Sequence, residues 1–155
     1  MVSVKSLYII DTSAILSQKP DEQYRRSIYC SLWDRIDQMI SDGLIVTCSE
    51  IAAEVQDESI KKWMSAVGLK ILPIDDEIQG NVVQIVNTIN PKLVDFKENK
   101  SSGDAFLIAT AQKYELTVIT EENQTSIKKI PFTCRKMGIK CVNLLGFMEE
   151  NGMAL

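Results

Sequence analysis

The fold is decided by the stretch SLYIIDTS, residues 6–13. Its apolar part, residues 6–10, is rich in residues that favour strands and ends abruptly at Asp11, Thr12 and Ser13. This pattern predicts a buried strand that leads directly into the start of a helix. In an open parallel sheet the functional crevice lies beyond the carboxyl ends of the strands, so Asp11 stands where a functional side chain is expected.

The remaining sequence alternates extended and helical patterns. Further extended runs lie at 44–47, 70–74, 116–120 and 140–144, with Pro73 marking the second of these as an edge strand or no strand. Helices are predicted at 24–41, 49–55, 58–67, 75–90 and 103–114, with a short final helix to about Glu150, and the polar residues 91–102 are expected to form a surface loop. Strands separated by helices pair in parallel through right-handed crossovers, so we expect an α/β fold with helices on both faces of the sheet.

Size and composition favour one globular domain over residues 1–155, since 45% of the residues are hydrophobic and 25% are charged. The apolar runs are too short to cross a bilayer, and the N-terminus lacks the cleavage site of a secretory signal. The four cysteines form no CxxC pair, so we expect reduced thiols and a cytoplasmic protein. A net charge of −4 argues only weakly against a nucleic-acid surface, because an acidic metal site would itself lower the total.

The chain contains no histidine. This excludes the Ser-His-Asp triad, the Cys-His pair, histidine-ligated zinc and imidazole general bases. Any reaction must therefore use carboxylates, hydroxyls, amines or a metal ion.

Acidic residues follow several of the predicted strands. They are Asp11 after the first strand, Glu50 and Glu54 after 44–47, Asp104 at the start of the helix 103–114, and Glu121 and Glu122 after 116–120. Carboxylates gathered in a cleft raise one another's pKa and need a countercharge. Because oxygen-only ligands suit Mg²⁺ or Mn²⁺ better than zinc, the sequence predicts a site for one of these ions.

Structural roles also account for some of these acids. Asp11 and Asp104 each precede or open a helix, where a carboxylate caps the helix or favours its positive end. Glu50 follows Thr47 by three residues, which is the spacing of a capping box. Glu54 is equally compatible with an exposed helical position. Of Glu121 and Glu122, at least one is expected to be a solvated loop charge.

Four segments, in this order, carry a family resemblance: IDTS at 10–13, SEIAAEV at 49–55, GDAFLIATA at 103–111 and VITEE at 118–122. The chain resembles a PIN domain over nearly its whole length. It is most similar to an uncharacterised PIN-like branch with a tryptophan in the second helix, here Trp33, and a late Ile-Pro-x-x-Cys element, here 130–134. The resemblance implies a three-layer α/β/α sandwich with a central parallel sheet of four to five strands. It also implies a VapC-like toxin of a type II toxin–antitoxin pair.

The same resemblance implies a metal-dependent endoribonuclease. Its catalytic and metal-binding residues would be Asp11, Glu54, Asp104 and Glu122, supported by Thr12, Ser13, Thr120 and Glu121. Asp11 and Asp104 would hold the principal Mg²⁺ or Mn²⁺, and Glu54 and Glu122 a second position, for in-line hydrolysis of a phosphodiester. Glu122 is chosen over Glu121 because the family's fourth acid comes two residues after the threonine that ends its strand. Most PIN domains have aspartate there, so the longer glutamate is a departure.

The stretch from Gln124 to Lys140 contains no acid. Its basic residues, Lys128, Lys129, Arg135, Lys136 and Lys140, are expected to contact the phosphate backbone of RNA, although a solvated face explains them equally well. Arg25 and Arg26 are a weaker second candidate. The family resemblance further implies an antitoxin protein and a second copy of the chain as partners, with no membrane.

Two other enzyme classes fit less well. A phosphatase of the haloacid-dehalogenase type needs a second aspartate two residues after Asp11, where this chain has Ser13. A receiver domain needs an acidic pair and a late lysine, and neither is evident. A catalytically silent PIN scaffold that binds RNA or protein stays open, and the presence of all four acids in order argues against it.

Overall fold

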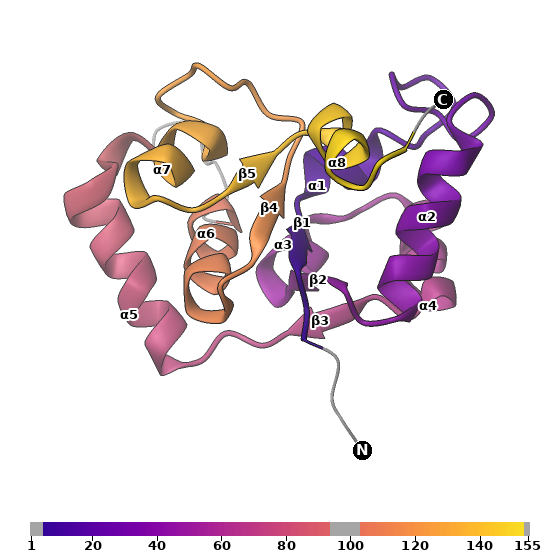
Figure 1. Ribbon diagram of the computed structural model, residues 1–155. Helices are drawn as coiled ribbons and strands as arrows, with labels where there is room; N and C mark the ends of the chain where they lie inside the picture. Colours follow the sequence, from indigo (N-terminus) through magenta and orange to yellow (C-terminus); the bar gives the residue numbers. More distant parts are fainter. Residues whose placement is uncertain (1–4, 94–102, 154–155) are drawn as a thin grey trace.

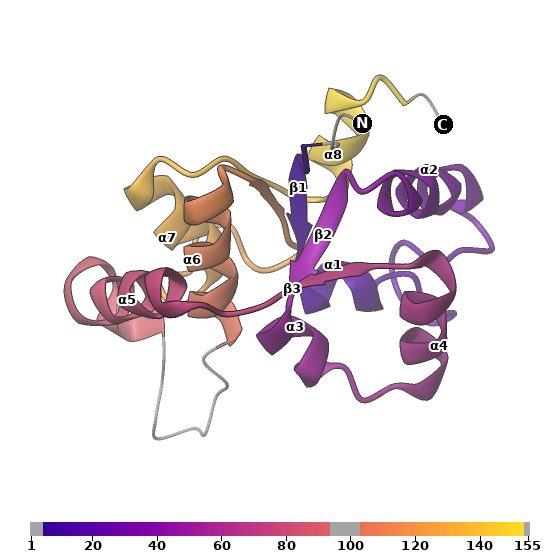
Figure 2. The same cartoon turned by 90° about the horizontal axis from the view of Figure 1, so that it is seen from below.

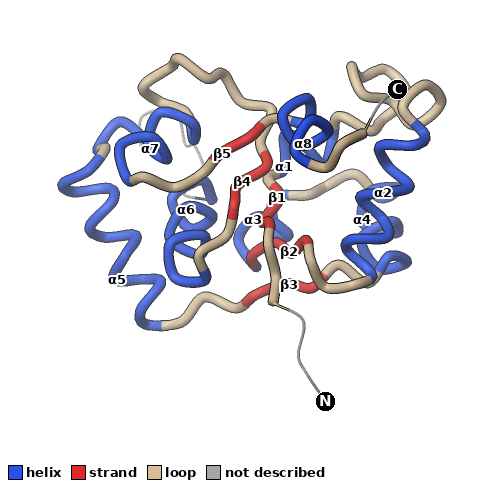
Figure 3. The backbone as a smooth tube through the Cα atoms, viewed as in Figure 1, coloured by secondary structure: helices blue, strands red, loops and turns tan. Residues whose placement is uncertain are grey.

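A five-stranded parallel sheet forms the centre of the molecule (Figures 1 and 3). The structure is a computed structural model that describes residues 5–93 and 103–153. In the order of pairing, the strands are β3 (Lys70–Leu72), β2 (Ile45–Cys48), β1 (Tyr8–Ile10), β4 (Thr117–Ile119) and β5 (Cys141–Val142). The parallel pairing predicted from the sequence is confirmed, and the run that contains Pro73 supplies the edge strand β3.

Helices cover both faces of the sheet, which makes the three-layer α/β/α sandwich that the sequence predicts (Figure 2). One face carries α1 (Thr12–Leu16), α2 (Cys30–Ser41), α4 (Glu58–Val67) and α8 (Leu144–Glu150). The other carries α3 (Ser49–Glu54), α5 (Asp76–Gln84), α6 (Gly103–Tyr114) and α7 (Ile130–Met137). A π-helical turn, Ile85–Ile89, continues α5, and a 3₁₀ turn, Pro91–Leu93, follows it.

Two apolar cores arise from the alternation of side chains along the central strands. Tyr8 and Ile10 of β1 pack into the core under α2 and α8, whereas Ile9 between them packs into the core under α6. All three are buried, as expected for a parallel strand covered on both faces.

The strand order places a topological switch point between β1 and β4. From β1 the chain continues to β2 and β3 on one side, while β4 and β5 lie on the other. The backbone N–H of Asp11 donates to the carbonyl of Ile119 at 2.9 Å, so the carboxyl ends of β1 and β4 lie directly side by side. Such a point is where open α/β sheets form their functional crevice.

The predicted start of the helix 24–41 is wrong, because α2 begins only at Cys30. Residues 17–29 instead fold back on the end of α1, with the N–H of Tyr24 donating to the carbonyl of Ser17 at 3.1 Å. Ile28, which extends the helical apolar spacing in the sequence, is 66% exposed. The helical spacing of Ile28 in the sequence therefore does not reflect packing in the core.

The structure also differs from the sequence-based predictions at α7 and at the start of α3. The sequence pattern did not predict α7, whose buried face includes Ile130 and Cys134. The capping box at Thr47 is not formed, because the N-cap of α3 is Cys48 and the Thr47 hydroxyl donates to the Ile10 carbonyl at 2.9 Å. Of the expected loop 91–102, the first three residues form the 3₁₀ turn, and 94–102 lie outside the described residues.

The cysteines are free thiols, in agreement with the sequence-based expectation. None of the helices within 5–93 and 103–153 combines the length and hydrophobicity that a membrane span requires.

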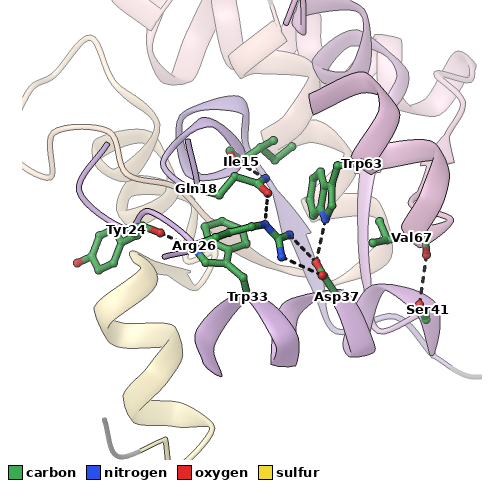
Figure 4. Close-up of polar contacts among 9 residues, drawn as sticks. All are labelled: Ile15, Gln18, Tyr24, Arg26, Trp33, Asp37, Ser41, Trp63 and Val67. Carbon is green, nitrogen blue, oxygen red and sulfur yellow. Dashed lines mark hydrogen bonds and ion pairs between the residues drawn. The ribbon is translucent and has the colours of Figure 1, made fainter. Parts of the chain in front are cut away.

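Arg26 connects the loop 17–29 to α2 and α4 (Figure 4). Its two terminal nitrogens donate to the Asp37 carboxylate at 3.1 and 2.8 Å, and its Nε donates to Gln18 at 2.8 Å. The guanidinium also lies 5.4 Å from the ring centre of Trp33 and 5.6 Å from that of Trp63. Arg26 is therefore engaged within the fold.

We expect Arg26→Ala to lower the free energy of unfolding by about 1–2 kcal/mol, because a two-pronged charged hydrogen bond and two cation–π contacts are lost. Arg26→Lys should recover only part of this loss, since lysine lacks the planar fork. Urea denaturation followed by tryptophan fluorescence measures the change. Arg35→Ala, at an exposed position of α2, is the matched control. Equal stability of the Arg26→Ala and Arg35→Ala variants would contradict the expectation.

Candidate functional site

Asp11 is a buried carboxylate at the switch point, with 2% of its surface exposed. Its Oδ2 accepts hydrogen bonds from the hydroxyls of Ser13 at 2.7 Å and Thr120 at 2.9 Å, and from the Ser13 N–H at 3.4 Å. It is the N-cap of α1, so the capping role considered from the sequence is real. Burial raises the pKa of Asp11, and the hydrogen bonds from Ser13 and Thr120 oppose that rise.

Glu54 comes to the same edge from α3. It is the last residue of that short helix, and its Oε2 accepts a hydrogen bond from the Thr12 hydroxyl at 3.1 Å. Thr12 is the first residue of α1, directly after Asp11. This contact links the end of α3 to the start of α1, and it orients the Glu54 carboxylate.

Asp104 and Glu122 form the other half of the cluster. Asp104 lies in the first turn of α6, and its pKa is raised to about 8, first by burial and then by the charges of Glu122, Asp11 and Glu54. Burial also raises the pKa of Glu122, opposed by a hydrogen bond from the Ile130 N–H at 3.0 Å and by one from Asp104. The structure therefore brings the four predicted acids within electrostatic range of one another.

Glu121 and Glu122 point to different elements. The Oε1 of Glu121 accepts a hydrogen bond from the N–H of Leu144, the first residue of α8, at 2.8 Å. Both glutamates are partly buried, so the expectation that one of them is a solvated loop charge is wrong. Glu121 holds the start of α8, and its own N–H donates to the Ser13 hydroxyl at 3.0 Å.

The basic stretch is divided among different environments. Lys129, the N-cap of α7, lies close enough to Asp104 and Glu122 to lower the pKa of both. Lys136 donates to the Ile89 carbonyl at 2.8 Å, and Lys140 pairs with Glu150. Lys128 and Arg135 are exposed. Within this basic stretch, Lys129 therefore lies beside the acids, Lys128 and Arg135 are exposed, and Lys136 and Lys140 already have partners within the fold.

The donor set is made of hard carboxylate and hydroxyl oxygens, which fits Mg²⁺ or Mn²⁺. Across the described residues no three acidic or thiol side chains already stand at metal-binding distances from one another. The cluster is therefore looser than a formed metal centre. Burial first and the neighbouring acids second raise the pKa of Asp104, and a divalent cation would favour the ionised form against both effects.

Sequence comparison assigns the family. Comparison with curated protein sequences gives no match. The profile of the family described as "Domain of unknown function (DUF4411)" matches residues 8–155. The chain belongs to this family. The match begins at the first residue of β1 and includes every element of this DUF4411 chain described above.

Solved structures share the fold of this DUF4411 chain at low sequence identity. FitAcB from Neisseria gonorrhoeae is 16% identical with a TM-score of 0.55, and the alignment covers 90% of this chain and 99% of that one. VapBC-1 from nontypeable Haemophilus influenzae is 14% identical with a TM-score of 0.54, covering 90% and 98%. PAE2754 from Pyrobaculum aerophilum is 10% identical with a TM-score of 0.53, covering 94% and 89%. The likeness confirms the PIN-like sandwich.

We expect Asp104→Asn to raise the free energy of unfolding at pH 8, in the presence of a chelator, by about 1–3 kcal/mol, because a buried group with three acidic neighbours loses its charge. Asp104 is protonated in the folded state up to a pH of about 8 but ionised above about 3.8 in the unfolded state. The free energy of unfolding of the parent chain therefore falls as the pH rises between these values. The gain should accordingly vanish near pH 4 and level off above pH 8.

The matched control is Asp76→Asn, because Asp76 is also an aspartate in the first turn of a helix but is exposed. That variant should lose slightly in stability, since it removes a charge that favours the helix N-terminus. Thermal and urea unfolding across pH 4–9 measures both variants. A gain for Asp104→Asn that does not change with pH would refute the electrostatic explanation.

Proposed function

We propose that this chain is a metal-dependent endoribonuclease that hydrolyses phosphodiester bonds of RNA. The observation that carries the proposal is the convergence of Asp11, Glu54, Asp104 and Glu122 at the β1–β4 switch point, where burial first and the charges of the other three acids second raise the pKa of Asp104 to about 8. A cluster of acids with perturbed pKa values in such a crevice is characteristic of a functional site.

Asp11 and Asp104 would hold the principal Mg²⁺ or Mn²⁺, and Glu54 and Glu122 would hold a second position. A bound ion of this kind supplies Lewis-acid activation of water and of the phosphate. The hydroxyls of Ser13 and Thr120 fix the Asp11 carboxylate. Thr12 fixes that of Glu54 in the same way. Ligands held by such neighbours keep their orientation when the ion and the substrate arrive.

The basic residues beside the acids support an RNA substrate. Lys129 stands next to Asp104 and Glu122, and Lys128 and Arg135 are exposed on the loop and the helix that follow. These three side chains would contact the phosphate backbone. Lys136 and Lys140 would contribute less, because each already has a partner within the fold.

We further propose that the chain is the cytoplasmic toxin of a toxin–antitoxin pair and forms a homodimer. The resemblance of the sequence to VapC-like toxins, together with the likeness of the fold to FitAcB and VapBC-1, supports an antitoxin partner. A small protein encoded beside this chain would be that partner. Its co-purification with the chain, and loss of RNA cleavage in the complex, would test this assignment.

The purified protein should cleave single-stranded RNA with Mg²⁺ or Mn²⁺ and not with EDTA. Asp11→Asn and Asp104→Asn should each lower the rate on the order of 100-fold or more, because each removes a charged ligand of the principal ion. Asp11→Asn keeps an oxygen that accepts the hydrogen bonds from Ser13 and Thr120, so the fold should persist. Cleavage of a labelled RNA and circular dichroism measure the two effects.

Neighbouring glutamates supply the control. Glu122→Gln should lower the rate strongly, whereas Glu121→Gln should stay within a few-fold of the parent chain, because glutamine can still accept the Leu144 N–H. Full activity of both Asp11→Asn and Asp104→Asn would refute the proposal. RNA binding without cleavage under any metal condition would instead favour the catalytically silent scaffold.

A further inference from the structure

A small pocket lies at the carboxyl ends of β4 and β5, against α7. Its lining includes Thr120, Gln124, Pro131, Arg135, Cys141 and Asn143. Its volume is about 130 Å³. Sites that bury drug-sized ligands typically measure about 300–1,000 Å³, so this pocket has room for only one small group.

The pocket adjoins the acid cluster. Thr120 belongs to both, since its hydroxyl donates to the Asp11 carboxylate at 2.9 Å. The pKa of the Cys141 thiol, also in the lining, is lowered by a hydrogen bond with Cys134, against burial and the charges of Asp11 and Glu122. Because Thr120 lines the pocket and also donates to Asp11, a group seated in the pocket lies close to a phosphate placed at the acids.

The lining combines polar edges with apolar faces. Pro131 and Ile139 provide apolar surface, and the side-chain amides of Gln124 and Asn143 provide donors and acceptors. The Asn143 amide is held in place, because its Oδ1 accepts the Gly146 N–H at 2.8 Å. Proteins read splayed-out bases of single-stranded RNA by hydrogen bonds to the base edges, together with stacking of the ring on a flat side chain. In this pocket the amides would supply the hydrogen bonds, and Pro131 and Ile139 would contact the faces of the ring.

Arg135 is exposed and is the charged residue of the lining. A guanidinium suits the contact with a phosphate oxygen. A single cation among neutral groups does not suit a cluster of phosphates, so the interior of the pocket is better matched to a neutral ring than to an anion.

We propose that this pocket takes one nucleobase of a single-stranded RNA, beside the phosphodiester held at the acid cluster, while Arg135 contacts an adjacent phosphate. The inference rests on the proposed function in one respect, namely that RNA is the ligand. It adds a base-binding subsite, built from Gln124, Asn143 and the apolar lining, that would give the protein a preference among RNA sequences.

Cys141 lines the pocket, so the reactivity of its thiol can report whether the subsite is occupied. The Asp104→Asn chain is used, so that the RNA is not cleaved. Alkylation of cysteines by N-ethylmaleimide is followed by peptide mass spectrometry, with and without saturating eight-nucleotide homopolymers of A, C or U. Fluorescence anisotropy of the same labelled RNAs establishes saturation in parallel.

RNA should slow the alkylation of Cys141 at least about fivefold, because a seated base covers most of a pocket this small. Cys30, exposed at the start of α2, should react at the same rate throughout and is the internal control. Cys48 and Cys134 are buried and should react slowly in every sample. Saturating RNA that leaves Cys141 fully reactive would overturn the proposal.

Two substitutions, each added to the Asp104→Asn chain, provide an independent readout. Arg135→Ala should weaken RNA binding about three- to tenfold for every sequence, because one phosphate contact is lost. Gln124→Ala should instead change the ranking of the three homopolymers. Arg35→Ala and Gln112→Ala, at exposed positions elsewhere, are the matched controls. Pocket variants that behave as these controls do would overturn the proposal.

The outcomes separate this proposal from the nuclease assignment. Protection of Cys141 by RNA that the unsubstituted chain never cleaves would support the subsite and refute the nuclease. Metal-dependent cleavage with no protection of Cys141 would support the nuclease and refute the subsite. Absence of RNA binding altogether would refute both.

Discussion

The buried carboxylate of Asp11 is the constraint on which the rest of the site depends. Its backbone N–H bonds the end of β4, its side chain caps α1, and its Oδ2 accepts hydrogen bonds from the hydroxyls of Ser13 and Thr120. The capping role of Asp11 and the metal-binding role that we propose for it are compatible. The hydrogen bonds that begin α1 also fix a charge at the switch point of the sheet, where the crevice of an open α/β fold lies.

Two adjacent glutamates, Glu121 and Glu122, have different partners, which separates a structural role from the metal-binding role that we propose. Glu121 points toward the N-terminus of α8 and Glu122 toward that of α7, and each accepts a backbone N–H there. Helix N-termini favour carboxylates electrostatically, so both helices begin where an acid is available. Only Glu122 also meets Asp104. Glu121 therefore stabilises the start of α8, while Glu122 adds an acid to a cluster whose members repel one another when they are ionised.

The sequence predicts the parallel sheet from its apolar runs, and the residues around the ends of those runs give six candidate acids. The choice of Asp11, Glu54, Asp104 and Glu122 among the six came from the family resemblance. The sequence does not reveal which acid hydrogen-bonds to which donor. Thr47 has the spacing of a capping residue but donates across the sheet to Ile10, and Glu121 gains its partner from Leu144, far along the chain. Residues 130–137 were predicted only as part of a basic stretch and of the Ile-Pro-x-x-Cys element, because a helix of eight residues makes little more than two turns and gives a weak periodic signal.

That missed helix removes the apparent conflict between a net charge of −4 and the RNA ligand that we propose. The N-cap of α7, Lys129, stands beside Asp104 and Glu122, and Arg135 further along the helix lines the adjoining pocket. Positive charge is thus concentrated at the rim of the acidic crevice. Because the potential that a phosphate meets depends on nearby charges and is screened beyond about 10 Å at 0.1 M salt, this local arrangement matters more than the total.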